Sequence, residues 1–247
     1  MDEKDVAPPE GRTRRVDTAM DFDVSPWELL VIRVSVLLIS LTTRVADVLL
    51  LLGRPWLLWP YLRVWLAEFT HSPYHLAPTF EVVRVLKSSA QDMRELVYGE
   101  TPVATAVWLF RRAGLGRGGR LVDVVAGRGR ALLAARWLGA EARGVDLLEQ
   151  HVNSVSGALR AAGASLVVGD ATREELGDAT HVYLAWTCLS PETKARVLER
   201  LRTCRPGTRI LTVTRPIESP DFPTVSRHRV LFTWGFEPVW VHEYRPS

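Results

Sequence analysis

The sequence predicts an α/β protein with a Rossmann-like mixed sheet of seven strands, five parallel strands followed by an antiparallel C-terminal hairpin. An apolar run leads directly into a Gly-x-Gly turn and then into a helical pattern over residues 130–138. The next two strand patterns each end at or beside an aspartate. The last two strand patterns of the chain are expected to pair as an antiparallel hairpin. The strand patterns lie at 121–125, 142–146, 165–169, 180–186, 207–214, 227–234 and 239–244.

Length, apolar content, net charge and cysteine count limit the classes of protein to which the chain can belong. The chain has 247 residues, 47% of them hydrophobic, which allows one α/β domain and a smaller segment. A net charge of +3 without a long basic run gives no indication of a nucleic-acid partner. Two cysteines and six scattered histidines form no metal-ligand or disulfide pattern, so we expect no metal. The acidic start argues against a secretory signal, and we expect a cytoplasmic protein.

The first 70 residues divide into a polar tail, residues 1–24, which we expect to be disordered, and an apolar helical segment, residues 25–70. Apolar residues of this segment share one wide helical face, and Arg44 and Asp47 are spaced to pair. Its longest uncharged run, residues 34–43, is shorter than the roughly twenty residues that a spanning helix needs. Interfacial or re-entrant helices at a membrane surface are therefore favoured. A helical cap on the rest of the chain, or a contact between copies, remains open.

We expect residues 71–247 to form one domain. It begins with helices over 79–96 and 103–112. In the connector between them, Thr101 is placed to cap the second helix and Pro102 to take its first position. A later helix covers 190–203. The proline-containing loop at 215–226 is either a lip over a substrate or a stiff crossover.

The glycine turn marks a ligand site. Gly127 and Gly129 let a ligand approach the backbone, and the N–H groups of the following helix point toward it. Asp146 closes the next strand seventeen residues after Gly129, where a carboxylate can accept hydrogen bonds from two ribose hydroxyls. Asp123 and Asp170 lie at or near the ends of neighbouring strands. We therefore expect a nucleotide-type ligand at this edge of the sheet.

The turn departs from the nicotinamide fingerprint, because Leu132 holds the third glycine position. It resembles the first motif of the class I S-adenosylmethionine (SAM) methyltransferases, apolar-apolar-acid-apolar-Gly-x-Gly-x-Gly, with Val125 in place of the first glycine. The resemblance implies SAM as the cofactor. Arg128 and Arg130 either meet the cofactor carboxylate or are solvated. The cofactor-binding residues that it implies are Tyr98, Glu100, Thr101, Asp123, Val125, Ala126, Gly127, Gly129, Asp146, Leu147, Asp170, Ala171 and Trp186.

Within that superfamily, residues 95–247 resemble the Dot-type histone-lysine methyltransferases and the related membrane-anchored lysine methyltransferases of an ATP-synthase membrane subunit. The resemblance rests on three segments: Tyr-Gly-Glu-Thr at 98–101, Ser-Pro-Glu at 190–192 and the chain end at 233–244. Ala185 and Trp186 stand where the Dot-type family has an asparagine pair. The resemblance implies that the loop at 98–101 folds over the cofactor. The catalytic candidates are Tyr98, Glu100, Trp186 and Thr187.

These observations predict a SAM-dependent methyltransferase whose leading acceptor is a protein lysine amine. Glu100 could hold the cofactor amino group, or it could be an acid placed near a helix start. Trp186 could form a wall for the acceptor, stack on the adenine, or belong to the core. A lipid-like or natural-product acceptor is the first alternative. The second is a non-catalytic, membrane-attached module that binds SAM or mediates an interaction, and oligomerisation through the N-terminal segment is open.

Overall fold

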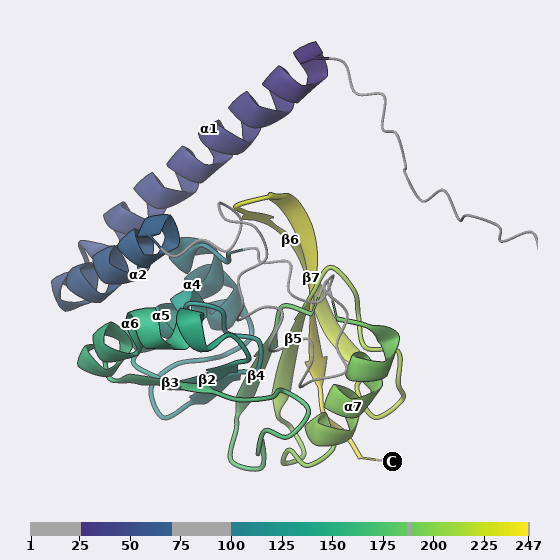
Figure 1. Cartoon of the computed structure of the whole chain (residues 1–247). Helices are drawn as coiled ribbons and strands as arrows, with labels where there is room; N and C mark the ends of the chain where they lie inside the picture. The colour runs from purple at the N-terminus through teal and green to yellow at the C-terminus, as the bar shows by residue number, and fades with distance from the viewer. Residues whose placement is uncertain (1–25, 71–99, 187–188, 247) are drawn as a thin grey trace, which may run out of the picture.

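The protein is a seven-stranded sheet with helices on both faces (Figure 1). The computed structural model describes residues 26–70, 100–186 and 189–246. Its helices are α1 (Pro26–Leu51), the short 3-10 helix η1 (Pro55–Leu57), α2 (Leu58–Thr70), α4 (Val103–Arg112), α5 (Arg130–Trp137), α6 (Glu149–Ala161) and α7 (Pro191–Leu201). Its strands are β1 (Arg120–Asp123), β2 (Glu141–Asp146), β3 (Ala164–Val168), β4 (His181–Leu184), β5 (Arg209–Val213), β6 (Thr224–Phe232) and β7 (Gly235–Glu243).

The order of the strands confirms the predicted fold class. They run β3-β2-β1-β4-β5-β7-β6, with the first five parallel and β7 antiparallel to both β5 and β6. The hairpin strands begin three and four residues earlier than expected, at Thr224 and Gly235. Gly235 has a φ of 132°, which allows a tight turn after Phe232. The expected tail at 1–24, the helix at 79–96, and the site candidates Tyr98 and Thr187 lie outside the described residues.

Two hydrophobic clusters cover the two faces of the sheet, and β4 contributes to both. Tyr183 points into the cluster formed with α4, α5 and α6, whereas Val182 and Leu184 point into the cluster that includes Val197 of α7. This alternation follows from the two-residue period of a strand. A strand that is buried on both faces reads as a continuous apolar run, which is why residues 180–186 could be recognised as a strand.

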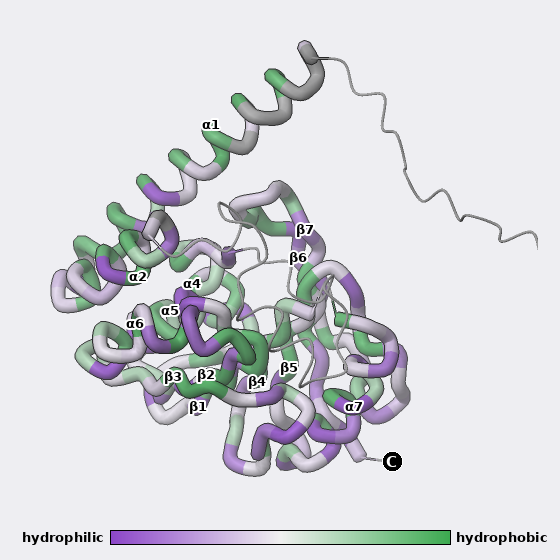
Figure 2. The backbone as a smooth tube through the Cα atoms, viewed as in Figure 1, coloured by the Kyte–Doolittle hydropathy of each residue, from purple (hydrophilic) through white to green (hydrophobic). Residues whose placement is uncertain are grey.

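The C-terminal end of α1 and one face of α2 are packed into the main core. Leu51, Leu57, Tyr61 and Val64 are buried in the same cluster as Leu132 of α5. The other end of α1 extends away from the body of the protein, and hydrophobic residues recur along its exposed length (Figures 1 and 2). Among the described residues, none of the helices is both long enough and apolar enough to cross a membrane.

Two local expectations were wrong. Arg44 does not pair with Asp47: its Nη2 lies 3.2 Å from Glu68 of α2, while Asp47 accepts the backbone N–H of Ala104 at 2.7 Å. Thr101 does not cap α4 either, because its hydroxyl lies 2.8 Å from the hydroxyl of Tyr183. Asp47 therefore supplies, from a distant helix, the acceptor that the start of α4 lacks locally.

Candidate functional site

The carboxyl ends of β1 and β2 lie side by side and form the floor of a cavity. Strands β2 and β3 lie on one side of β1 and β4 lies on the other, so the cavity is at the point where the strand order reverses. Open α/β sheets bind ligands at such a point. The residues that line the cavity are Glu100, Thr101, Asp123, Val125, Ala126, Gly127, Arg130, Ala131, Asp146, Tyr183 and Ala185.

The turn between β1 and α5 is tight because two glycines adopt positive φ angles. Gly127 has a φ of 53° and Gly129 a φ of 76°. A Cβ atom on Gly129 would lie 2.7 Å from Leu159 of α6, so helix packing also requires glycine there. On β2, a Cβ atom on Gly144 would lie 2.8 Å from the Cβ of Ala126. The close approach of the turn to β2 therefore depends on Gly144, a role that the strand pattern at 142–146 did not indicate.

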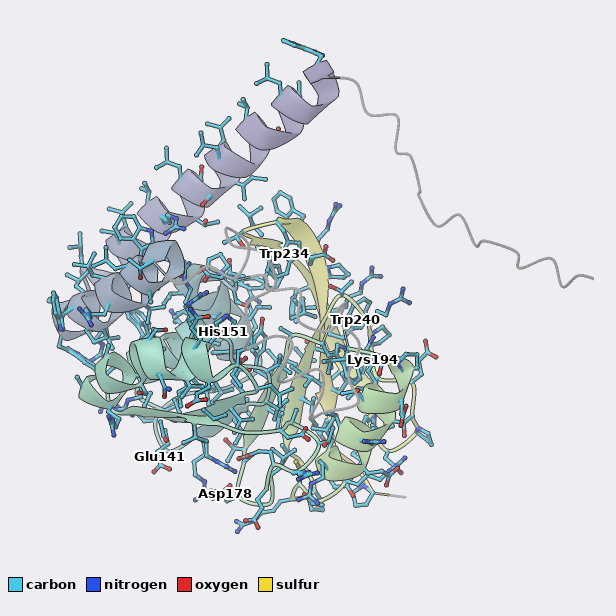
Figure 3. The ribbon with its side chains drawn as sticks, in the orientation of Figure 1. Glu141, His151, Asp178, Lys194, Trp234 and Trp240 are labelled. Atoms are coloured by element: carbon cyan, nitrogen blue, oxygen red, sulfur yellow. The ribbon has the colours of Figure 1, made fainter. Side chains whose placement is uncertain are left out.

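Asp146 holds the turn in place and still has capacity to bind a ligand. Its Oδ2 accepts the N–H of Gly127 at 2.8 Å, and its Oδ1 accepts the N–H of Leu148 at 3.0 Å. The ring of His151 on α6 (Figure 3) places Nδ1 3.3 Å from Oδ1. An ionised carboxylate offers about four acceptor positions. The carboxylate can therefore accept hydrogen bonds from a ligand hydroxyl without releasing the turn.

Asp123 is buried at the end of β1. Burial, helped by the nearby Asp146 charge and opposed by a hydrogen bond from the N–H of Val125, raises the pKa of its carboxyl group to about 8. At neutral pH much of this carboxyl group is therefore protonated. A cationic ligand in the cavity would favour the ionised form, so Asp123 is suited to compensate a positive charge.

Arg128 and Arg130 are buried, and the expectation that they could be solvated was wrong. Only 2% and 3% of their surfaces are exposed. The Nη2 of Arg130 lies 2.8 Å from Oε2 of Glu100, and the Nη1 of Arg128 lies 3.9 Å from Oε1 of the same carboxylate. Of these three residues, Arg130 and Glu100 line the cavity. The cavity therefore presents both signs of charge.

Seven of the predicted cofactor residues line this cavity, and the others that can be described lie elsewhere. Asp170 accepts the N–H and the hydroxyl of Thr172, each at 2.8 Å, and so fixes a local turn. Trp186 is buried in the second cluster, where its Nε1–H donates to the carbonyl of Arg215 at 3.1 Å. Ala171 is in the same cluster. Gly129 shapes the turn without lining the cavity, and Leu147 follows Asp146 half-buried.

The sequence interpretation missed Tyr183 and two acids of the N-terminal helices. Tyr183 is fully buried in the middle of β4, and its register with Asp123 on β1 brings its hydroxyl to the cavity. A tyrosine in an otherwise apolar strand was a usable signal. Asp47 and Glu68 contact Arg130 from distances of more than sixty residues along the chain, and no local pattern indicates such contacts.

No protein-family model matches the sequence, and no curated protein gives a significant match. Among solved structures, an RNA methyltransferase from Salinibacter ruber, in complex with S-adenosylhomocysteine, is 20% identical with a TM-score of 0.51, covering 60% of this chain and 95% of its own. TrmN from Thermus thermophilus is 18% identical with a TM-score of 0.50 and matches 61% of this chain. The match spans about half of TrmN, 51% of its length. At these identities the likeness shows the fold alone, a Rossmann-like α/β sheet that the chain shares with these methyltransferases.

Proposed function

We propose that the protein is a SAM-dependent methyltransferase that binds its cofactor in the cavity at the ends of β1 and β2. One observation supports this most strongly. Asp123 and Asp146, from adjacent strand ends, border one cavity, and the backbone turn at Gly127 closes it. The pair matches the needs of a nucleoside linked to a cationic group, because Asp146 can accept ribose hydroxyl groups and Asp123 can balance a positive charge.

The residues present fit such a cofactor in part. The enclosed volume is about 70 Å³, well below the roughly 300 Å³ of a typical small-molecule pocket. The cavity would therefore enclose only one end of the cofactor, with the rest lying along the strand ends. Val125 lines the cavity and takes space that glycine leaves free in the family pattern. Glu100 and Arg130 offer complementary charges to an amino-acid group.

When bound, SAM would supply an electrophilic methyl group on a sulfonium. The part of the protein is to align the acceptor, to keep water away and to compensate charge. Asp123 and Glu100 can balance cations, and the hydroxyls of Thr101 and Tyr183, 2.8 Å apart, can orient a polar group at the β4 side of the cavity. An amine acceptor must arrive deprotonated, which a desolvated site favours.

The leading acceptor that we propose is a protein lysine amine. Support comes from the sequence, in the segments at 98–101 and 190–192. In the latter, Ser190 accepts the N–H of Thr193 at 3.1 Å and Pro191 begins α7, as the family pattern implies. A lipid-like or natural-product acceptor is the alternative. Mass spectrometry of a proteome and of a lipid extract, each treated with the protein and isotopically labelled SAM, separates the two. A protein that binds SAM but labels neither would be a non-catalytic module.

We also propose that the outer face of α1 and α2 docks on a lipid surface. At about 100° per residue, the exposed apolar residues of α1 fall within a stripe about 120° wide, and Arg44 and Asp47 lie outside that stripe. Each member is 43–70% exposed. The stripe consists of Trp27, Leu30, Val31, Val34, Leu37, Leu38, Leu41, Val45, Val48 and Leu49.

Trp56 on η1 and Trp59 on α2 are exposed as well, and the guanidinium of Arg63 lies 6.0 Å from the Trp59 ring centroid. Tryptophan beside arginine suits a lipid headgroup region. The test is flotation with anionic vesicles. We expect the wild-type protein to float and Leu37→Glu/Leu41→Glu to stay in solution. The control Val167→Glu/Val168→Glu, which adds the same charge at two exposed positions of β3, should float. A wild-type protein that does not float but forms a dimer in light scattering would assign the surface to a second copy.

A further inference from the structure

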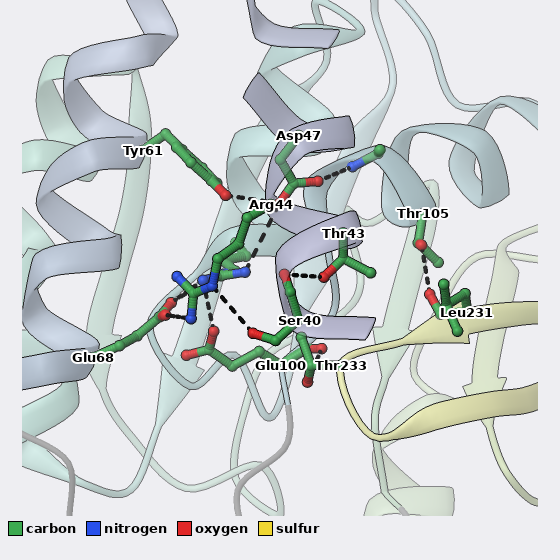
Figure 4. Close-up of polar contacts among 12 residues, drawn as sticks. Ser40, Thr43, Arg44, Asp47, Tyr61, Glu68, Glu100, Thr105, Leu231 and Thr233 are labelled. Atoms are coloured by element: carbon green, nitrogen blue, oxygen red, sulfur yellow. Dashed lines mark hydrogen bonds and ion pairs between the residues drawn. The ribbon is translucent and has the colours of Figure 1, made fainter. Parts of the chain in front are cut away.

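The carboxylates of Asp47 on α1, Glu68 on α2 and Glu100 before α4 gather in one place (Figure 4). All three contact the guanidinium of Arg130. Its Nε–H donates to Oε1 of Glu68 at 2.7 Å, its Nη2 lies 2.8 Å from Glu100, and its Nη1 lies 3.8 Å from Asp47. Glu68 also contacts Nη2. Burying a cation costs free energy unless the cation is paired with an anion. The positions of the three carboxylates therefore restrict where the guanidinium can lie.

Two of the three carboxylates belong to the N-terminal helices and are themselves held in place. Asp47 of α1 is fully buried, and it accepts the hydroxyl of Tyr61 at 3.1 Å and the N–H of Ala104 at 2.7 Å. Glu68 of α2 accepts a second cation, Arg44, at 3.2 Å. The ring of Tyr61 lies 5.6 Å from the guanidinium of Arg130. The helices thus determine both the position and the orientation of Arg130.

We infer that Glu68 and Asp47 are positioning residues for the cofactor site, and that α1 and α2 are a working part of that site. The inference rests on the proposed function. Arg130 and Glu100 are the charged pair on the cavity wall nearest to these helices. If the helices supplied no carboxylates, Glu100 would be the one ion-pair partner left to Arg130 among the described residues. The pair would then be free to shift within the cavity, and its fit to the amino-acid end of a ligand would be lost.

The test compares two ligands in calorimetric titrations of the full chain. S-adenosylhomocysteine carries the amino-acid end, and 5′-methylthioadenosine has the same nucleoside and thioether without it. The titrations are run at pH 9, above the pKa of about 8 to which burial raises the Glu68 carboxyl group. We expect Glu68→Gln, which keeps a neutral acceptor for Arg130 but removes the negative charge, to weaken the affinity for S-adenosylhomocysteine about 10-fold. The affinity for methylthioadenosine should stay within about twofold. Arg130→Gln should show the same selectivity, and the double variant should be no weaker than Arg130→Gln alone, because the two residues act together.

The matched control is Glu199→Gln on α7, which removes an exposed carboxylate that is paired with Arg202 and should change neither affinity. If Glu68→Gln does not fold, Glu68→Asp, which keeps the charge but shortens the reach, takes its place with the same expectation. An unchanged S-adenosylhomocysteine affinity, or an equal loss for both ligands, would overturn the positioning role. A folded wild-type protein that binds neither ligand would instead refute the proposed function, and the inference with it.

Discussion

Replacing Asp123 by asparagine should make the protein more stable at alkaline pH while impairing its site. The unfolded carboxyl group titrates near its ordinary value of 3.8, and burial raises the pKa in the folded protein to about 8. Because the folded state holds the proton more tightly, the free energy of unfolding falls as pH rises between these values, by about 1.4 kcal/mol per pH unit. Between pH 5 and pH 8 this one group costs about 3 to 4 kcal/mol.

Asparagine removes that cost and keeps the acceptor for the N–H of Val125. The assay is urea unfolding of the wild type and Asp123→Asn at several pH values from 5 to 9. We expect the two stabilities to be similar at pH 5, to diverge with rising pH in favour of the variant, and to reach a constant difference above pH 8. Other groups with a raised pKa, such as Glu68, are present in both proteins, so their contributions cancel in the difference between the two unfolding free energies. A difference that does not change with pH would refute the argument that Asp123 is buried and protonated.

Three further variants test separate parts of the structure. Gly144→Ala should destabilise the protein by about 1–3 kcal/mol and weaken S-adenosylhomocysteine in calorimetry, because the added Cβ meets Ala126 at 2.8 Å; an unaffected melting curve would contradict the close packing. Trp186→Leu should lower the melting temperature but leave S-adenosylhomocysteine affinity within twofold, and a selective loss of affinity would return Trp186 to the cofactor site. Tyr183→Phe should cost about 1 kcal/mol in urea unfolding, through the lost contact with Thr101, and no cost would argue against that hydrogen bond.

The elements that the sequence predicted well are those whose signals are local. The strand predicted at 121–125, which is β1 at Arg120–Asp123, lies in one βα unit with the glycines at 127 and 129, and the acid at 146 ends the neighbouring strand. Parallel strands joined by helices bring their carboxyl ends to one edge, so sequence spacing translates directly into the cavity floor. The helix at 103–112 was predicted with its bounds unchanged, although Pro102 lies at the N-cap and not at the first helical position that its residue type indicated.

The parts that could not be predicted depend on tertiary contacts. Arg130 follows the glycine turn and gives no sign in the sequence that its partners are Asp47 and Glu68. Thr101 has the residue type and position of a helix cap, but its hydroxyl forms a hydrogen bond with the hydroxyl of Tyr183 on β4 instead. Trp186 follows the end of β4 near the site. Its side chain is packed in the cluster that contains Val197, on one face of the sheet, and the sequence does not indicate which of the two faces it takes. In each case packing decides between two locally acceptable outcomes.

The most direct test of the central claim is calorimetric titration of S-adenosylhomocysteine into the full chain and into Asp146→Ala, with circular dichroism to establish that both are folded. The proposal predicts binding by the wild type that is lost in Asp146→Ala, because this carboxylate both faces the cavity and fixes the turn at Gly127. Binding that is unchanged in a folded Asp146→Ala, or no binding by a folded wild type, would contradict the assignment of this cavity as a SAM site.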